Sequence, residues 1–220
     1  MRGLSVGLGF NPNAGAPSPV VLSELWANQT KWTQDNSGNR ASIVDIAGYV
    51  AAVRGTTSLN TAERWTGSLP AICTIDFVVN QTAAWIDEIT DAVKILLWDD
   101  GTTRTTGLSA AIANEDGYLV TITAIAAQVE EQNDGAHSSR ADQAITLAEG
   151  LTTFRIRANK TAGTIKVYQG TTLVCDVTDA SMPAGLGTGF LVGHGCVNTA
   201  GEKVHLGTVT VSTGDLGAPA

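Results

Sequence analysis

Alternation of apolar and polar side chains is the feature that most constrains this chain, and it is clearest in residues 153–177. The apolar members of the alternating series are Phe154, Ile156, Ala158, Ile165, Val167, Leu173, Cys175 and Val177. Successive side chains of a strand point to opposite faces, so this period of two predicts strands with one buried face. The breaks at residues 159–163 and 169–170 contain residues that favour turns. The segment therefore predicts three antiparallel strands joined as a meander.

Similar strand patterns recur along most of the chain. They cover residues 41–47, 49–53, 70–79, 92–98, 108–113, 118–124, 187–194 and 203–211. With 24 glycines available for turns and only 15% charged residues, about ten or eleven short strands favour an all-β sandwich. We expect less than about 10% helix, well below the usual share of globular domains. The only candidates for helical turns are residues 58–64 and 83–90, and the polar stretch 128–142 is expected to be a long loop.

The pattern divides the chain into an extended N-terminal arm (residues 1–20), a β-sandwich (21–212) and a C-terminal tail (213–220). Three prolines between residues 12 and 19 exclude a helix or a central strand there. The apolar residues that alternate with small or polar ones at the start of the arm are Leu4, Val6, Leu8 and Phe10. These four could add to a neighbouring subunit as an edge strand. The alternative is that Val6 and Phe10 pack on their own domain.

The charge balance excludes two classes of partner. The net charge is −8 with only 13 Lys and Arg residues, and no basic run occurs. Nucleic acids and anionic membranes both require a basic surface, so neither is an expected partner. Because no signal peptide and no membrane-spanning apolar stretch is visible, we expect a soluble protein made in the cytoplasm. Three widely spaced cysteines, Cys73, Cys175 and Cys196, are expected to be reduced, and Cys175 with Cys196 is the one pair to test for a disulfide.

No pattern of catalytic residues is present. Glycoside hydrolysis needs two carboxyl groups at a fixed separation, whereas Asp87, Glu88 and Asp91 are wrongly spaced for one strand face. No Gly-x-Ser-x-Gly elbow accompanies the three histidines, His137, His194 and His205. The acidic turns at residues 99–100, 114–116 and 133–134 do not match a calcium loop. We therefore expect neither an enzyme nor a bound cofactor.

The tryptophans are the best candidates for a binding role. An exposed indole ring can stack on a sugar, but tryptophan is also a common core residue. Trp65 and Trp85 follow polar or small residues, so they are the candidates for carbohydrate binding at the surface. Packing in the core or between subunits is the alternative for both.

Several segments resemble a known superfamily. The run from Phe154 to Arg157, the segment 164–174 and the glycine-rich 185–193 resemble the late strands of concanavalin A-like, laminin G-like jelly rolls. The resemblance covers roughly residues 24–212 and implies an antiparallel jelly-roll sandwich of two sheets. Its members include glycoside hydrolases, lectins, carbohydrate-binding modules and structural domains of viruses and phages. The fold therefore does not select the function.

Our leading expectation is a non-enzymatic structural protein of a virion, as a phage capsid decoration protein or a tail-associated subunit. It would be made in the host cytoplasm, would bind other capsid or tail subunits, and would form a homo-oligomer or a multi-copy assembly. Flexible arms and the absence of a signal peptide motivate this hypothesis. The alternative is a carbohydrate-binding module or lectin-like domain with glycans as partners.

Overall fold

Every regular element in the described part of the chain is a β-strand. The computed structural model describes residues 20–24, 31–34, 42–46, 49–53, 59–81, 92–100, 116–133, 136–182, 186–196 and 203–220. Within these ranges there is no helix, and all strand pairs are antiparallel. The expected all-β class is confirmed.

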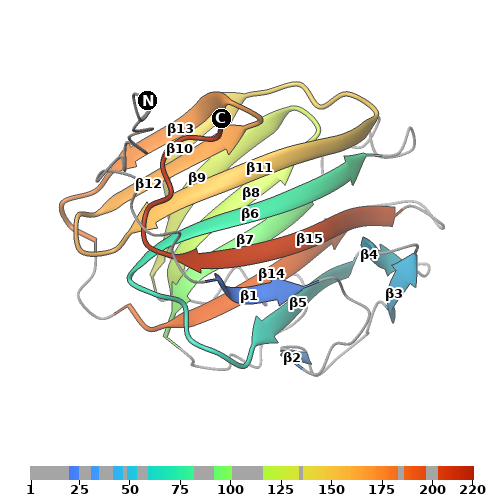
Figure 1. Ribbon diagram of the computed structural model, residues 1–220, viewed down its shortest axis with the longest axis horizontal. Helices are drawn as coiled ribbons and strands as arrows, with labels where there is room; N and C mark the ends of the chain where they lie inside the picture. Colours follow the sequence, from blue (N-terminus) through green and yellow to red (C-terminus); the bar gives the residue numbers. More distant parts are fainter. Residues whose placement is uncertain are drawn as a thin grey trace, which may run out of the picture.

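The strands form two sheets, one packed in front of the other in Figure 1. In sheet A the strands follow one another in the order β13 (Thr172–Thr178), β12 (Thr164–Gln169), β11 (Gly150–Asn159), β6 (Ile72–Gln81), β15 (Lys203–Thr213), β4 (Tyr49–Val53) and β3 (Ser42–Ile46), with β1 (Val20–Glu24) pairing with β15. In sheet B the order is β10 (Ala136–Ala144), β9 (Ala126–Asn133), β8 (Gly117–Thr123), β7 (Ala92–Asp99), β14 (Gly189–Cys196), β5 (Leu59–Trp65) and β2 (Trp32–Gln34). This arrangement is the expected jelly-roll sandwich.

The core lies between the sheets and takes every second residue of the central strands. On β6 the side chains of Cys73, Ile75, Phe77 and Val79 are at most 1% exposed, and they alternate with residues that face away from sheet B. The rings of Phe77 and Phe154 stack at a centroid distance of 5.3 Å. Burial of a large apolar side chain contributes about 1.5–3 kcal/mol, so this alternation is what fixes the register of the strands.

The meander predicted from residues 153–177 is present as β11, β12 and β13. Phe154 pairs with Gln169 and Asn159 with Thr164 across the first hairpin, and Val167 pairs with Cys175 across the second. Gly163 and Gly170 in the two turns have φ values of 65° and 54°, in the left-handed region that glycine adopts without strain. The sequence pattern and the turn residues therefore agree.

Two sequence expectations are wrong. Residues 128–142, expected as a loop, form most of the β9–β10 hairpin, in which Asn133 pairs with Ala136. β10 is an edge strand with nearly all of its residues exposed, so it needs no apolar alternation. Residues 58–64, expected as a helical turn, lie mostly in β5, which pairs with β14 and β2. Pairing with two neighbours overrides the weak local preference for helix.

Other expectations fall on residues that the structure does not describe. They are the arm residues Leu4, Val6, Leu8 and Phe10, the segments 83–90 and 108–113, and Trp85. Val20, placed at the end of the arm, is the first residue of β1. No helix in the described part of the chain is long and apolar enough to cross a membrane.

The C-terminal segment lies on the outer face of sheet A. In Figure 1 it leaves the end of β15 and runs in front of the sheet towards the C label. The Gly214 N–H donates to the Ile72 carbonyl at 2.8 Å, and the Leu216 N–H donates to the Thr74 hydroxyl at 3.0 Å. Of the expected tail (residues 213–220), Thr213 is the last residue of β15, and the segment that follows is tied to β6 by these two hydrogen bonds.

Candidate functional site on the outer face of sheet A

The outer face of sheet A carries polar side chains from three neighbouring strands. Because Phe77 and Phe154 point into the core, the residues beside them in the sequence point outwards. Asp76 and Val78 of β6 lie next to Thr153 and Arg155 of β11, since Arg155 pairs with Asp76 and Thr153 with Val78. β15 adds Thr208 and Thr210 on the other side of β6. Acidic, basic, hydroxyl and small apolar groups therefore meet on one face.

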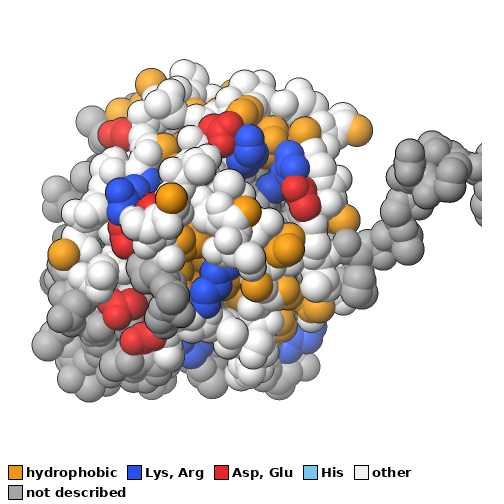
Figure 2. All heavy atoms as spheres, turned by 90° about the vertical axis from the view of Figure 1, so that its left-hand side faces the viewer, with side chains coloured by type: hydrophobic (Ala, Val, Ile, Leu, Met, Phe, Trp, Pro, Cys, Tyr) orange, Lys and Arg blue, Asp and Glu red, His pale blue; other side chains and the backbone are white. Residues whose placement is uncertain are grey.

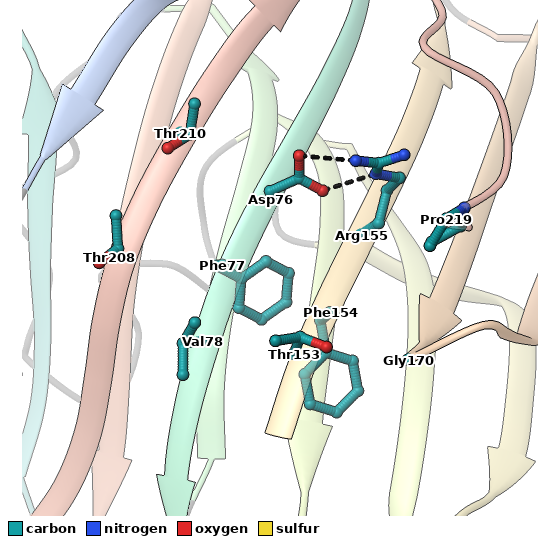
Figure 3. Close-up of a pocket in the computed structure, with 10 residues that line it drawn as sticks. All are labelled: Asp76, Phe77, Val78, Thr153, Phe154, Arg155, Gly170, Thr208, Thr210 and Pro219. Carbon is teal, nitrogen blue, oxygen red and sulfur yellow. Dashed lines mark hydrogen bonds and ion pairs between the residues drawn. The ribbon is translucent and has the colours of Figure 1, made fainter. Parts of the chain in front are cut away.

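These side chains surround a groove of about 300 Å³, shown in Figure 3. The residues that line it are Asp76, Phe77, Val78, Thr153, Phe154, Arg155, Gly170, Thr208, Thr210 and Pro219. In Figure 3 the rings of Phe77 and Phe154 lie behind the strands, whereas Pro219 stands beside Arg155 on the side of Gly170. The groove thus has a sheet as its floor and the C-terminal segment along one side.

An ion pair stands at one end of the groove. Arg155 donates from Nε to Asp76 Oδ1 at 2.6 Å and from Nη2 to Asp76 Oδ2 at 3.0 Å. Two such parallel bonds fix both side chains in one geometry. The Asp76 side chain is still 39% exposed, and a carboxylate has about four lone-pair sites. Asp76 can therefore accept further hydrogen bonds from a ligand.

The C-terminal segment is held beside the groove by a second bidentate ion pair. Arg157 donates from Nε and Nη2 to the two carboxylate oxygens of Asp215, both at 2.5 Å. The Nη1 of Arg157 donates to the Tyr168 hydroxyl at 2.9 Å, and the guanidinium lies 5.9 Å from the ring centroid. The hydrogen bonds from Arg157 lower the pKa of Asp215, and the hydrogen bonds to Asp215 raise the pKa of Arg157.

On the described part of sheet A, several exposed charged side chains form pairs of opposite sign. Lys166 and Asp176 form a third pair on the strands β12 and β13, at 2.8 Å. Figure 2, which views the sandwich from the left-hand side of Figure 1, shows basic and acidic side chains lying next to each other. The groove also holds one charge of each sign, because Asp76 and Arg155 are the charged groups among its described lining residues and pair with each other.

A second polar cluster lies between the two sheets. The buried Tyr118 hydroxyl of β8 donates to Asp179 Oδ2 at 2.6 Å, and Arg140 Nε of β10 lies 3.1 Å from the same oxygen. Ser181 donates to Asp179 Oδ1 from its hydroxyl at 2.7 Å. Hydrogen bonds from Ser181 and Tyr118 lower the pKa of Asp179, while burial and the bond to Asp179 raise that of Tyr118. Arg140 also pairs with Glu131 of β9.

This inner cluster joins the edges of the sheets and offers little access to a ligand. Asp179 follows β13 of sheet A, whereas Tyr118 and Arg140 belong to sheet B. The Asp179 N–H also donates a hydrogen bond to the Gly163 carbonyl at 2.7 Å. A Cβ on Gly163 would lie 2.1 Å from the Asp179 carbonyl oxygen, so only glycine fits there. We assign this cluster a structural role.

Trp65, a candidate for sugar binding at the surface, is buried in the core, as the alternative for this residue predicted. Trp65 is 9% exposed, and its ring meets Phe190 edge to face at a centroid distance of 6.4 Å. A Cβ on Gly67 would lie 2.3 Å from the Trp65 ring, so the chain also covers the indole from that side. The polar residues before Trp65 misled the prediction, because neighbours in a strand point to opposite faces. Trp85 lies outside the described residues, so its assignment to sugar binding stays a prediction.

The cysteines and the candidate metal ligands can be placed in part. Cys73 and Cys175 are free, buried thiols, and burial raises their pKa values to about 12 and about 11. The disulfide considered between Cys175 and Cys196 is therefore not formed. His137 lies on the exposed strand β10, 3.8 Å from a Glu130 carboxylate oxygen. Among the described residues no cluster of three or more His, Cys, Asp or Glu side chains could hold a metal ion.

The residues of the groove were not found from the sequence. Asp76 and Arg155 are 79 positions apart, and Arg157 and Asp215 are 58 apart, so no local motif connects them. One signal was available: the two arginines alternate with buried residues on β11, which places both on the outer face. Their acidic partners, Asp76 and Asp215, could be identified only once the structure showed which segments lie beside β11.

Comparison with solved structures identifies the fold. Lectin II from Ulex europaeus matches with a TM-score of 0.64 at 10% identity, over 89% of this chain and 100% of the lectin. The carbohydrate-binding module CBM66 from Bacillus subtilis matches with a TM-score of 0.55 at 14% identity, over 84% of this chain and 96% of the module. A Bacillus subtilis protein of unknown function with a galectin-like fold has a TM-score of 0.67 at 7% identity, over 90% and 97% of the two chains.

These likenesses show the concanavalin A-like jelly-roll fold and nothing finer, because the identities are low. No protein-family model matches the sequence. No curated protein matches it either.

Proposed function

We propose that this protein is a non-enzymatic carbohydrate-binding domain and that the groove beside Asp76 and Arg155 binds the sugar. The observation that carries the proposal is the groove itself, where a half-exposed carboxylate in a fixed position meets several threonine side chains. Sugar hydroxyls both donate and accept hydrogen bonds, and carboxylates and hydroxyls are suitable partners for them. Val78 and Pro219 offer small apolar surfaces for the C–H groups of a sugar ring.

The fold likeness supports the same class of function. Two of the similar structures are named as a lectin and as a carbohydrate-binding module. These two structures support the carbohydrate-binding alternative better than our leading expectation of a virion protein.

The groove favours binding over hydrolysis. Glycoside hydrolysis uses two carboxyl groups, one on each side of the scissile bond. Asp76 is the sole carboxylate among the described residues that line the groove, and both of its oxygens already accept hydrogen bonds from Arg155. Because the described lining offers no second carboxyl group, we expect no cleavage of a bound glycan.

A glycan array followed by calorimetric titration of the best ligands tests the proposal. The variant Asp76→Asn keeps the shape of the side chain but removes the charge that accepts sugar hydroxyls. We expect it to bind the ligand about tenfold more weakly or worse, as for the loss of a hydrogen bond to a charged group. Asp176→Asn is the matched control, because Asp176 pairs with Lys166 on the same sheet but does not line the groove.

Either of two results would contradict the proposal. One is an array on which the wild-type protein binds no glycan. The other is a glycan that Asp76→Asn and the wild type bind equally well, which would move the site away from the groove.

The role as a virion structural protein stays a separate prediction. It requires capsid or tail subunits as partners and location in a particle, and no comparison supports either. The arm residues that motivated it, Leu4 to Phe10, lie outside the described part of the chain. Electron micrographs of material purified from the native source would test it, and a glycan-binding domain displayed on a particle would satisfy both hypotheses.

A further inference from the structure

We propose that the C-terminal segment 214–220 is a fixed wall of the groove, latched by Arg157 and Asp215, which restricts the groove to a single neutral sugar unit. This inference rests on the proposed function, since it concerns the ligand of the same site. Three observations carry it: the size of the groove, the balance of its charges and the contacts of the segment.

The size of the groove favours one sugar unit. Its volume of about 300 Å³ lies at the lower limit for sites that bind small molecules. Pro219 stands along one side of the groove and the Asp76–Arg155 pair at one end, as Figure 3 shows. A longer chain crossing the sheet in the direction of Pro219 would meet the C-terminal segment, so this wall selects for a short ligand or for the end of a glycan.

The charges of the groove favour a neutral sugar. Arg155 is its one cationic side chain among the described lining residues. Two of its nitrogens donate to Asp76, and the third lies 3.4 Å from the Gly217 carbonyl oxygen. The guanidinium is therefore already neutralised, and the carboxylate of an acidic sugar would meet Asp76 as a like charge. A neutral sugar avoids this repulsion and can still donate hydroxyl protons to Asp76.

The wall is built from specific contacts rather than from loose packing. The Thr74 hydroxyl donates to the Gly214 carbonyl at 3.0 Å and accepts from the Leu216 N–H at 3.0 Å. Asp215 then binds Arg157 through both carboxylate oxygens and accepts from the Gly217 N–H at 2.9 Å. The segment also touches Arg155 through the Gly217 carbonyl. The latch residue Asp215 thus connects the segment to β11, the strand that also carries Arg155 of the groove.

Two variants open the wall in different ways. Asp215→Asn weakens the latch but keeps the segment, whereas a chain ending at Thr213 removes the segment. Asp176→Asn is again the control, since it breaks an exposed ion pair elsewhere on sheet A. Amide hydrogen exchange of residues 214–217 measures the latch without any sugar. Titration with methyl glycosides of neutral hexoses, the matching linear trisaccharides, glucuronic acid and N-acetylneuraminic acid measures selectivity.

We expect exchange at residues 214–217 to be faster in Asp215→Asn than in the wild type and unchanged in Asp176→Asn. The ratio of trisaccharide to monosaccharide affinity should rise by about tenfold in the chain ending at Thr213, and by less in Asp215→Asn. Wild-type protein should bind the acidic sugars more weakly than the neutral hexosides.

Three results would contradict these expectations, and they can be told apart. If the wild type binds sugars and the affinity ratio is the same in both opened variants, the segment is not a selective wall and the inference is overturned while the proposed function stands. Tighter binding of an acidic sugar than of neutral hexosides overturns the assignment of the ligand class. Absence of any sugar binding by the wild type overturns both the proposed function and this inference.

Discussion

Two networks of charged side chains hold parts of sheet A in place, and they differ mainly in their access to water. In the inner network the Asp179 side chain is 6% exposed, lies between the sheets and accepts hydrogen bonds from Tyr118 and Ser181. In the outer network Asp215 is 48% exposed and pairs with Arg157 on the surface. If a partner is removed, water can replace it in the outer network but hardly in the inner one. The inner network should therefore determine global stability, and the outer one local structure and binding.

The largest expected effect is that of removing Asp179. Asp179→Ala leaves the buried Tyr118 hydroxyl and the Arg140 guanidinium without their shared acceptor. We expect the free energy of unfolding to fall by about 3 kcal/mol, the lower end of the range for a broken buried pair, because Arg140 is partly exposed. Urea denaturation followed by tryptophan fluorescence measures the change. Asp176→Ala, at an exposed pair, is the control, and equal losses in the two variants would contradict the comparison.

Tyr118→Phe should have the second largest effect. It removes one hydroxyl and leaves the ring in the core, where Trp98 meets it edge to face at 6.5 Å. Loss of a buried hydrogen bond to a charged group should lower the free energy of unfolding by about 1–2 kcal/mol. The double variant with Asp179→Ala sharpens the test: its loss should be smaller than the sum of the two single losses. Additive losses would show that Tyr118 and Asp179 do not act together.

The difference between buried and exposed side chains also explains how much of the fold could be predicted from the sequence. The meander of β11, β12 and β13 could be predicted because each strand has one apolar face and ends in a turn. β10 could not, because at the edge of sheet B its side chains are exposed on both faces and carry no period. The fold class therefore followed from the strands that cover the core, and the errors fall where burial is small or where pairing overrides local preference.

Neither network could be predicted, for a different reason. Tyr118 and Asp179 are 61 residues apart, and their contact depends on the order of the strands in both sheets. A pattern with period two says that Arg155 and Arg157 share a face, but it does not say which strand lies beside β11. The groove needs β6, β11, β15 and the C-terminal segment together. Trp65 shows a limit of local sequence context. Polar residues precede it, yet its own side chain points into the core.

Acid should affect the inner network through Asp179. Hydrogen bonds from Ser181 and Tyr118 lower its pKa below the ordinary value of 3.8. A carboxyl group whose pKa is lower in the folded state stabilises the protein above its unfolded pKa, and this contribution is lost as the pH falls through the folded pKa. We expect the difference in unfolding free energy between wild type and Asp179→Asn to be constant at neutral pH and to shrink from about pH 4 downwards. Chemical denaturation at a series of pH values measures it, and a difference that grows in acid would contradict the assignment.

The smallest expected effect on stability belongs to the outer network. Exposed ion pairs contribute about 0–1 kcal/mol, since water and salt screen them. Asp215→Asn should therefore lower the free energy of unfolding by less than about 1 kcal/mol, even though Arg157 binds both carboxylate oxygens. Arg157 also donates to the Tyr168 hydroxyl at 2.9 Å, so removing the Asp215 charge does not take away its last partner. Denaturation in low and high salt measures this contribution, which should decrease as salt is added. A loss as large as that of Asp179→Ala would show that the C-terminal segment is part of the folding core, and the division between a stabilising inner network and a locally acting outer one would then be wrong.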